Sequence, residues 1–156
     1  MAKRGMNQNN GDFMNILFVC TGNTCRSPMA EGLFKKLLAE KNISNVSCSS
    51  AGIFAMTGDD ATPESIRACE CFGVDISAHR ARRVTAYILD ETDRFVCMTN
   101  EHAASLSLYV DPKKIVVLGN GIPDPFGGDA ETYMRCANSI KTALANQFDE
   151  ITAEAE

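Results

Sequence analysis

Residues 15–31, with the sequence NILFVCTGNTCRSPMAE, decide the fold of this chain. The run from Ile16 to Val19 is short and continuously apolar, which is typical of a strand buried on both faces. The run stops at Cys20, and a loop of five residues then separates Cys20 from Arg26. Features typical of a helix start follow at once, so this stretch predicts a strand, a tight loop and a helix N-terminus.

Three residues after the loop indicate where the helix begins. Ser27 is a good N-cap, Pro28 is favoured at the first helical position, and Glu31 would stand near the positive end of the helix dipole. The apolar residues that follow recur at helical spacing on one face: Met29, Leu33, Phe34, Leu37 and Leu38. We therefore expect the strand to run through the loop directly into an amphipathic helix.

A junction of this kind is suited to binding an anion. Several backbone N–H groups can converge on one point there, and the helix dipole favours negative charge. Gly22 permits the positive φ that such a loop can need, and Asn23 is the next most tolerant residue. No Gly-Lys-Ser/Thr follows, so the loop is not a nucleotide-binding P-loop. We predict that these residues bind phosphate or another oxyanion: Thr21, Gly22, Asn23, Thr24, Cys25 and Ser27.

Cys20 stands at the centre of the loop, and its neighbours predict a nucleophile. A nearby arginine and a helix N-terminus lower the pKa of a cysteine from about 8.5 to roughly 3.5–7.5, so we expect a thiolate at neutral pH. Arg26 would hold two equatorial oxygens of a phosphoryl group with its planar guanidinium, and Ser27 would donate a hydrogen bond to the leaving sulfur. The alternative is that Cys20 is a buried cysteine at the end of a core strand.

The segment VCTGNTCRSPMAE, residues 19–31, resembles the signature of the low-molecular-weight protein tyrosine phosphatase family. Thr24 makes it most similar to the bacterial protein-arginine-phosphatase branch of that family. The resemblance extends, less densely, over nearly all of the chain after residue 14. It implies a four-stranded, flavodoxin-like sheet and hydrolysis of phosphorylated side chains in proteins.

The rest of the chain alternates strands with helices. The predicted strands cover residues 16–19, 45–50, 93–98 and 115–118. The first predicted helix has its N-cap at residue 27. The later predicted helices cover residues 63–72, 84–89, 100–109 and 129–148. This order predicts an α/β fold, a single doubly wound parallel sheet with helices on both faces. Ligands of such sheets bind outside the carboxyl ends of the strands, where Cys20 lies.

Composition limits the classes of function. The chain has 156 residues, of which 45% are hydrophobic and 22% charged, and this is ordinary for a soluble globular protein. We expect residues 1–12 to be a flexible extension and residues 13–156 to form a single phosphatase domain. A net charge of -5 argues against nucleic acid and anionic membrane as partners, and no run is long enough to span a membrane.

The cysteine and histidine content predicts a cytoplasmic protein without a metal. Seven cysteines at irregular spacing fit a reducing cytoplasm better than a disulfide framework. The chain has two histidines, and the pair Cys69 and Cys71 is not matched by a second pair at metal-ligand spacing. We expect no metal and no other cofactor.

The loop after the fourth predicted strand is a candidate for the general acid. Residues 122–128 read IPDPFGG and would lie on the same rim of the sheet as Cys20. Asp124 stands between Pro123 and Pro125, which restrict its backbone. From the residues alone, Asp-Pro is an ordinary turn signal. The resemblance implies that Asp124 protonates the leaving group and later accepts a proton from the water that hydrolyses a phosphocysteine.

Thr24 and Phe126 are predicted to select the substrate. Tyrosine-specific relatives typically have an aliphatic residue at the position of Thr24 and a second aromatic ring after Asp-Pro, where this chain has Phe126 followed by Gly127. A planar phosphoguanidinium, rich in donors, suits a hydroxyl and a carboxylate better than an aryl group does. Phosphoarginine is therefore the predicted substrate class and phosphotyrosine the alternative. Thr24 as a loop filler without effect on substrate choice remains open.

Two other functions have less support. Arsenate reduction in relatives with a similar loop needs two further cysteines on a mobile segment after the third strand, and residues 99–108 contain none. Pro28 also differs from the glutamine expected in those relatives. A phosphate-binding module without activity would lack Cys20, Arg26 or Asp124, and all three are present.

Several residues outside the predicted chemistry are expected to support the loop or to lie on the surface. The resemblance suggests a regulatory disulfide between Cys25 and Cys20, and simple packing of Cys25 in the loop is an equal alternative. It also suggests that His79 supports the loop near Asn23, and Ser50 is expected to help hold the loop. Three arginines are predicted to form a solvated face: Arg80, Arg82 and Arg83.

Overall fold

Four short segments form one parallel sheet in the computed structural model, which describes residues 13–154. The strands are β1 (Met14–Cys20), β2 (Val46–Gly52), β3 (Arg94–Cys97) and β4 (Ile115–Val117). Their order is β2-β1-β3-β4, and every pairing is parallel. The predicted four-stranded, doubly wound α/β fold is confirmed. The predicted flexible extension, residues 1–12, lies outside the described residues.

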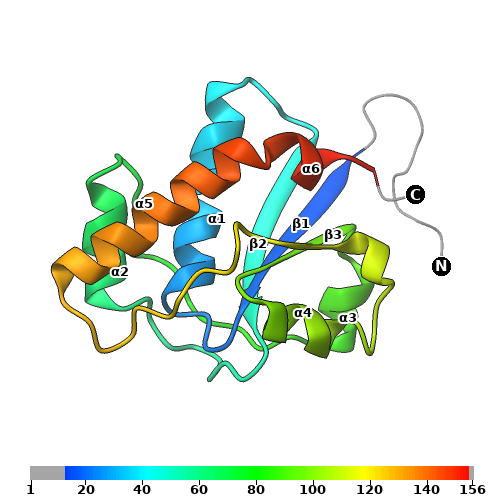
Figure 1. Cartoon of the computed structure of the whole chain (residues 1–156), viewed down its shortest axis with the longest axis horizontal. Coiled ribbons are helices and arrows are strands. Elements are labelled where there is room, and N and C mark those ends of the chain that lie inside the picture. Colours follow the sequence, from blue (N-terminus) through cyan, green and yellow to red (C-terminus); the bar gives the residue numbers. More distant parts are fainter. Residues whose placement is uncertain (1–12, 155–156) are drawn as a thin grey trace.

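Helices cover both faces of the sheet (Figure 1). The α-helices are α1 (Arg26–Glu40), α2 (Pro63–Glu70), α3 (Ala86–Asp90), α4 (Asn100–Leu106), α5 (Ala130–Asn146) and α6 (Phe148–Thr152), and one turn of 3₁₀ helix is η1 (Pro112–Lys114). Helices α1, α2 and α5 pack together on one face, whereas α3 and α4 lie on the other.

Strand β1 holds the two layers together because its side chains alternate between two apolar clusters. Ile16 and Phe18 belong to the cluster under α1 and α5. Leu17 and Val19 belong to the smaller cluster under α3 and α4. All four side chains are at most 1% exposed, and burial of each contributes about 1.5–3 kcal/mol. The sequence in front of the loop is therefore fixed in place from both sides.

Helix α1 begins at Arg26, two residues before the predicted first helical position at Pro28, and Ser27 is not its N-cap. Cys25 occupies the N-cap position without a side-chain hydrogen bond to the helix. Ser27 is buried in the first turn, and its hydroxyl is directed to Cys20 instead. Glu31 falls beyond the first turn, where its carboxylate accepts hydrogen bonds from Ser50 and Lys35. The first N–H groups of α1 are thus not capped by a side chain.

The predicted last helix is interrupted at Gln147. This residue has φ -104° and ψ 13°, and it separates α5 from α6. Its side-chain oxygen accepts from the Gly119 N–H at 2.6 Å, and its side-chain nitrogen donates to the Val117 carbonyl at 3.1 Å. Helical periodicity in the sequence could not show this break, because the side chain of Gln147 bonds to backbone at the end of β4.

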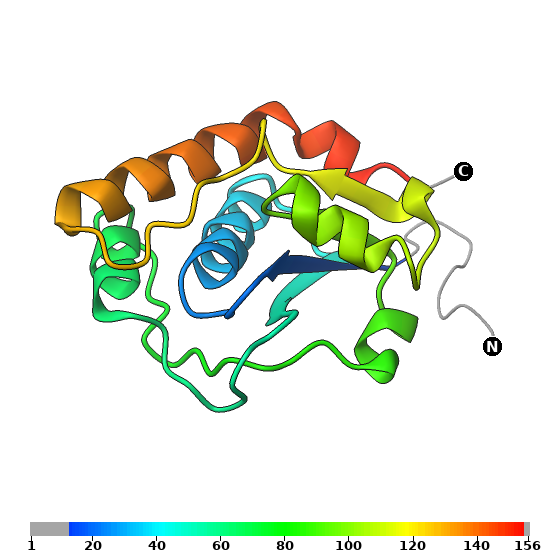
Figure 2. The same ribbon diagram turned by 60° about the horizontal axis from the view of Figure 1, so that its bottom comes forward.

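The topology brings two loops to one end of the sheet. The chain passes from β1 to β2 on one side and later to β3 on the other, so the strand order reverses beside β1. Ligands of such sheets bind at this position, beyond the carboxyl ends of the strands. Figure 2 shows the loop between β1 and α1 and the loop that precedes α5 at this same end.

Candidate active site

The loop between β1 and α1 is shaped by one buried asparagine. Asn23 has φ 57°, the left-handed conformation that asparagine tolerates well, and it is completely buried. Its backbone N–H donates to the Cys20 Sγ at 3.2 Å. Its side-chain nitrogen donates to the Ser27 Oγ at 2.8 Å and to the Ser50 Oγ at 3.0 Å. The predicted part of Ser50 in holding the loop is confirmed by this contact.

Cys20 lies at the floor of the loop and is 2% exposed. Its Sγ and the Ser27 Oγ share a hydrogen bond of 2.8 Å. Burial raises the pKa of the Cys20 thiol above its ordinary value, while the Ser27 hydroxyl, the N–H groups of Ser27 and Asn23, and Arg26 oppose this shift. The predicted lowering of the pKa is wrong for this geometry. Burial removes water from around the sulfur, and this effect outweighs the hydrogen-bond donors on which the prediction was based.

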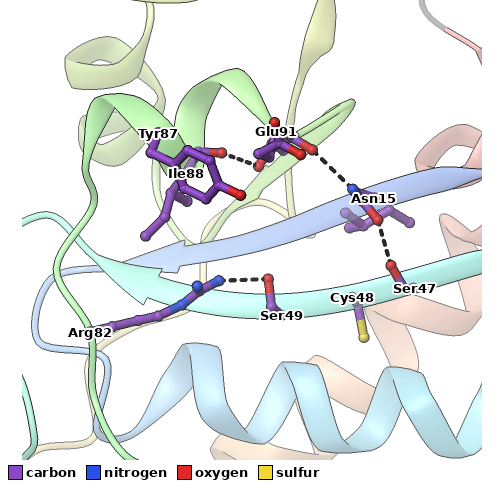
Figure 3. A pocket seen from close by; sticks show the side chains of 10 residues that line it. Asn15, Ser47, Cys48, Ser49, Arg82, Tyr87, Ile88 and Glu91 are labelled. Atoms are coloured by element: carbon purple, nitrogen blue, oxygen red, sulfur yellow. Dashed lines mark hydrogen bonds between the residues drawn. The ribbon is translucent and has the colours of Figure 1, made fainter. Parts of the chain in front are cut away.

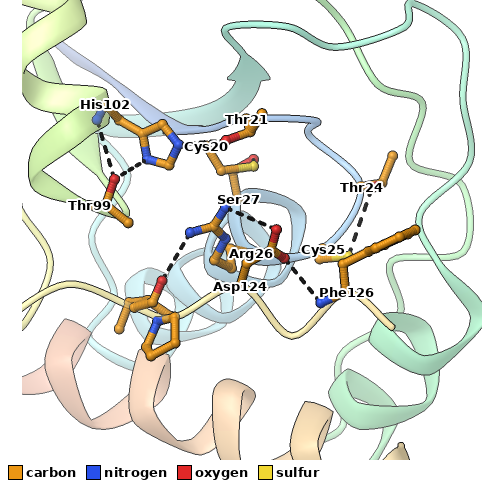
Figure 4. Close-up of polar contacts among 12 residues, drawn as sticks. Cys20, Thr21, Thr24, Cys25, Arg26, Ser27, Thr99, His102, Asp124 and Phe126 are labelled. Atoms are coloured by element: carbon orange, nitrogen blue, oxygen red, sulfur yellow. Dashed lines mark hydrogen bonds and ion pairs between the residues drawn. The ribbon is translucent and has the colours of Figure 1, made fainter. Parts of the chain in front are cut away.

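Arg26 is held between the loop of residues 21–25, called the phosphate loop after its predicted ligand, and the loop that precedes α5 (Figure 4). Its Nη1 donates to the Ile122 carbonyl at 3.0 Å, and its Nη2 lies 3.7 Å from the Asp124 Oδ2. The Arg26 side chain is 6% exposed, whereas that of Asp124 is 54% exposed. A buried guanidinium thus stands beside a carboxylate that is open to solvent.

The loop around Asp124 has a defined local conformation. The Phe126 N–H donates to the Asp124 Oδ1 at 3.1 Å, so the carboxylate closes a short turn over Pro125. Gly127 follows with φ 83°, a conformation that favours glycine. Asp124 and Arg26, predicted from separate motifs, are brought together here.

The two residues predicted to select the substrate occupy the two loops. Thr24 is half-buried, and its carbonyl accepts a hydrogen bond of 3.0 Å from the Thr62 N–H. Phe126 is 73% exposed. Figure 4 draws Thr24 on the phosphate loop and Phe126 on the loop that carries Asp124.

Cys25 is a buried, free thiol that packs against α5. Its Sγ lies 3.4 Å from the hydroxyl of Tyr133 and 3.7 Å from that of Thr62. These contacts are those of a packing residue at the start of α1. Cys20 is also a free thiol in this structure, and the disulfide between the two stays a prediction.

His79 and Arg82 support the loop from outside. The His79 Nε2 shares a hydrogen bond of 2.8 Å with the Asn23 carbonyl, which confirms the suggested position of His79. The prediction of a solvated face is wrong for Arg82. Its N–H donates to the Asn23 Oδ1 at 2.9 Å, and its guanidinium donates to the Ser50 carbonyl at 2.9 Å and to the Ser49 Oγ at 2.8 Å.

Arg82 also lines a cleft beside β2, shown in Figure 3. The cleft has a volume of about 270 Å³ and lies between β2 and α3. Its other walls include Asn15, Ser47 and Tyr87. Arg80 and Arg83 are exposed as predicted, although Arg80 pairs with Asp60 at 3.1 Å.

His102 is a candidate functional residue that was not predicted from the sequence. It lies in the first turn of α4, is 6% exposed, and its Nε2 is 2.9 Å from the Thr21 Oγ1. The signal that could have found it is the sequence Thr99-x-x-His102 directly after β3. This places a capped helix start at the same end of the sheet as the phosphate loop.

Residues 13–154 contain neither a metal-ligand cluster nor a helix that could cross a membrane. Within that range, no three or more His, Cys, Asp or Glu side chains are grouped to hold a metal ion. Among the helices described there, none is both long and apolar enough to cross a membrane.

A parallel sheet that ends in an anion-binding loop with a thiol at its floor is the arrangement of the cysteine-dependent phosphatases. Residues 15–156 match the family model described as "Low molecular weight phosphotyrosine protein phosphatase". The chain belongs to this family, as its signature segment predicted, and it is a low-molecular-weight protein phosphatase.

The relatives that are similar to this chain are named for three different activities. A protein-arginine-phosphatase of Bacillus subtilis (strain 168) is 36% identical over 140 residues, which cover 84% of this chain and 92% of the relative. The crystal structure of a low-molecular-weight protein tyrosine phosphatase from T. tengcongensis superimposes with a TM-score of 0.83 at 32% identity, covering 88% of this chain and 99% of that one. Arsenate reductase 1 of Staphylococcus epidermidis is 33% identical, over 83% of this chain and 91% of the relative.

Proposed function

We propose that this phosphatase hydrolyses phosphoarginine in proteins through a phosphocysteine formed on Cys20. The observation that carries the choice of substrate is Thr24, a half-buried hydroxyl in the phosphate loop where tyrosine-specific relatives have an aliphatic side chain. Similarity to the Bacillus subtilis protein-arginine-phosphatase over 84% of the chain supports the same choice.

The first step transfers the phosphoryl group to sulfur. The thiol proton of Cys20 passes to an oxygen of the dianionic phosphoryl group, since burial raises the pKa of the thiol and leaves a thiolate without substrate unfavourable. The sulfur then attacks phosphorus, and the bond from phosphorus to the leaving nitrogen breaks. Asp124, as the carboxylic acid, donates a proton to that nitrogen, so the arginine side chain of the substrate leaves as a guanidinium.

The second step restores the thiol. A water molecule attacks the phosphorus of the phosphocysteine, and the Asp124 carboxylate accepts one of its protons. The bond from phosphorus to sulfur breaks, the proton that the phosphoryl oxygen took from the thiol returns to the sulfur, and inorganic phosphate leaves. The Ser27 hydroxyl, 2.8 Å from the Cys20 Sγ, donates a hydrogen bond to the departing sulfur.

Arg26 and the backbone of the phosphate loop supply the electrostatic stabilisation in both steps. The Arg26 guanidinium is already oriented by the Ile122 carbonyl and by Asp124, so little reorganisation is needed when a phosphoryl group binds. The Asn23 N–H is directed at the Cys20 Sγ in the same way. These residues require no metal ion for the reaction.

A phosphoguanidinium fits the polar groups at the mouth of this site. Its N–H groups need acceptors, and the carbonyl oxygen of the Asp124 carboxyl group and the Thr24 hydroxyl are such acceptors. Phosphotyrosine is the second candidate, because Phe126 is 73% exposed and offers an aromatic face to a phenyl ring. Arsenate reduction lacks a relay, since α4 and the residues just after it contain no cysteine.

The deciding experiment compares kcat/KM on matched peptides that carry phosphoarginine or phosphotyrosine. We expect phosphoarginine to be preferred, and we expect Thr24→Ile to shrink the preference by about 10- to 100-fold because an apolar pocket no longer pairs with the substrate. Thr24→Ser is the matched control, since it keeps the hydroxyl and should keep the preference. Cys20→Ser is the blank.

Two outcomes would overturn parts of the proposal. A preference for phosphotyrosine in the wild-type protein would refute the choice of phosphoarginine and leave the two-step mechanism intact. Turnover that survives in Cys20→Ser would show that Cys20 is not the nucleophile and would refute the mechanism.

We place the reaction in the cytoplasm, because it needs Cys20 as a thiol and a reducing compartment maintains one.

A further inference from the structure

A chain of hydrogen bonds leads from α4 to the second residue of the phosphate loop. The Thr99 Oγ1 caps α4 by accepting from the His102 N–H at 3.3 Å, and it lies 3.0 Å from the His102 Nδ1. On the other side of the ring, the His102 Nε2 lies 2.9 Å from the Thr21 Oγ1. One imidazole therefore joins a helix cap to the loop that holds Cys20 (Figure 4).

The helix cap is the basis on which we assign the direction of this chain. The Thr99 Oγ1 accepts from a backbone N–H, and we assign its own hydrogen to the His102 Nδ1, 3.0 Å away. A neutral imidazole that accepts at Nδ1 carries its hydrogen at Nε2, and it then donates to the Thr21 Oγ1. The hydrogen of the Thr21 hydroxyl is left free for a different acceptor.

The surroundings of His102 keep the imidazole neutral. Burial and the positive charge of Arg26 lower the pKa of His102 to about 4, and Glu101 and Asp124 oppose this shift. Glu101 belongs to α4 itself, Arg26 to α1 and Asp124 to the loop before α5. At neutral pH the ring has one donor and one acceptor, as the chain from Thr99 to Thr21 requires.

Thr21 occupies a suitable place for a contact with the substrate. It follows Cys20 directly, and unlike Cys20 it is exposed. Its carbonyl accepts from the Phe54 N–H at 2.9 Å, so its backbone is fixed by the segment after β2. With the backbone and the side-chain oxygen both held on an exposed residue, the hydroxyl hydrogen is available to an acceptor that binds at the loop.

We propose that His102 is a positioning residue that fixes the Thr21 hydroxyl as a donor to the bound phosphoryl group. This inference rests on the proposed phosphatase mechanism but not on the choice between phosphoarginine and phosphotyrosine. Negative charge on the equatorial oxygens must be balanced as phosphorus moves between the leaving group and Cys20, and a preorganised donor stabilises it without reorganisation. A hydrogen bond to a charged group of this kind corresponds to about 10- to 100-fold in kcat.

A double-mutant cycle tests the pairing of His102 with Thr21. We would measure kcat and KM of the wild-type protein, His102→Ala, Thr21→Val and the double variant, with p-nitrophenyl phosphate as substrate. We expect each single variant to lose about 10- to 100-fold in kcat with little change in KM, and the double variant to lose no more than either one. Losses that multiply, or single variants within twofold of wild type, would overturn the proposal.

Further variants separate positioning from folding. Thr21→Ser keeps the hydroxyl and should retain most of the activity, and Thr21 is exposed, so Thr21→Val leaves the core intact. Ser107→Ala, at the exposed C-terminal end of α4, is the control for a change in the same helix and should behave as wild type. Inhibition by orthovanadate should weaken in parallel with kcat in both single variants. A loss of activity in Thr21→Ser equal to that in Thr21→Val would contradict a role for the hydroxyl.

Failure of the phosphatase mechanism looks different from failure of this inference. If Cys20→Ser retains the turnover of p-nitrophenyl phosphate, the mechanism fails and the inference fails with it. If the wild-type protein is active, Cys20→Ser is inactive and the losses in the cycle multiply, then His102 and Thr21 act independently and only the inference is wrong.

Discussion

At the scale of single residues, Asn23 organises the site more than any charged group does. Its backbone and side chain take part in five hydrogen bonds, with Cys20, Ser27, Ser50, His79 and Arg82. These partners come from β1, α1, β2 and the segment after α2, so one buried amide joins four parts of the chain. Its left-handed backbone directs its N–H at the sulfur, and the side-chain bonds hold that backbone in place.

Ser27 should control how easily the Cys20 thiol ionises. Replacing Ser27 with Ala removes the side-chain donor that most strongly opposes the effect of burial, so we expect the apparent pKa of Cys20 to rise further. The rate of alkylation by iodoacetamide as a function of pH measures that pKa. We also expect kcat to fall by roughly 10²- to 10³-fold, as for other lost donors to a developing anion. An unchanged alkylation profile would show that the Ser27 hydroxyl does not stabilise the thiolate.

Asp124 should matter in proportion to the basicity of the leaving group. In Asp124→Asn no proton can be donated to the leaving group, so we expect kcat/KM on a phosphopeptide, which reports the transfer to Cys20, to fall by about 10²- to 10⁴-fold. The loss in kcat/KM on p-nitrophenyl phosphate should be much smaller, because nitrophenolate leaves without a proton. Steady-state kinetics on the two substrates measure this difference. Equal losses on both would argue that Asp124 acts only by holding Arg26, 3.7 Å away.

At the scale of elements, the strands and the loop were predictable, and the contacts between elements were not. Continuous apolar runs such as that from Ile16 to Val19 predict strands because burial on both faces demands them. The start of α1 was misplaced, because Ser27 has the chemistry of an N-cap but its hydroxyl bonds to Cys20 instead. Arg82 and His102 escaped prediction because their partners lie 59 and 81 positions away in the sequence.

Strand β2 supports the phosphate loop through a glycine at its end. A Cβ at Gly52 would lie 2.5 Å from the Thr21 carbonyl oxygen and 2.9 Å from the Asn23 nitrogen, and both are backbone atoms that cannot move aside. We expect Gly52→Ala to displace the loop, to lower stability by about 1–3 kcal/mol and to weaken protection by inorganic phosphate. Urea denaturation with and without phosphate measures both effects.

Gly32→Ala is the matched control for that experiment. A Cβ at Gly32 would be equally crowded, 2.7 Å from the Ile76 Cγ2 and 2.8 Å from the Val74 Cγ1, but these are ends of side chains in the segment between α2 and α3, not backbone atoms of the loop. We expect this variant to lose stability without losing its response to phosphate. If Gly52→Ala responds to phosphate as Gly32→Ala does, then β2 does not set the shape of the loop.

At the scale of the whole molecule, the sheet separates the site from a second polar centre. The phosphate loop lies at the carboxyl ends of the strands, whereas Arg94 begins β3 at the opposite end. Arg94 is 5% exposed, and its guanidinium donates to three backbone carbonyls, those of Ile151, Lys113 and Ala153. It thereby ties α6 and the residue after it to η1 and β3.

Arg94→Met should therefore destabilise the fold without altering the chemistry. The change leaves carbonyls at the ends of α6 and η1 without their donor, which costs about 1–3 kcal/mol. For a chain of this size we expect Tm to fall by roughly 2–4 °C for each kcal/mol lost, and kcat/KM measured well below Tm to stay within about twofold of wild type. Arg94→Lys keeps the charge but not the planar guanidinium, so its Tm should lie between those of the wild-type protein and Arg94→Met. A fall in kcat/KM that follows Tm across the three proteins would instead show that the two ends of the sheet are coupled.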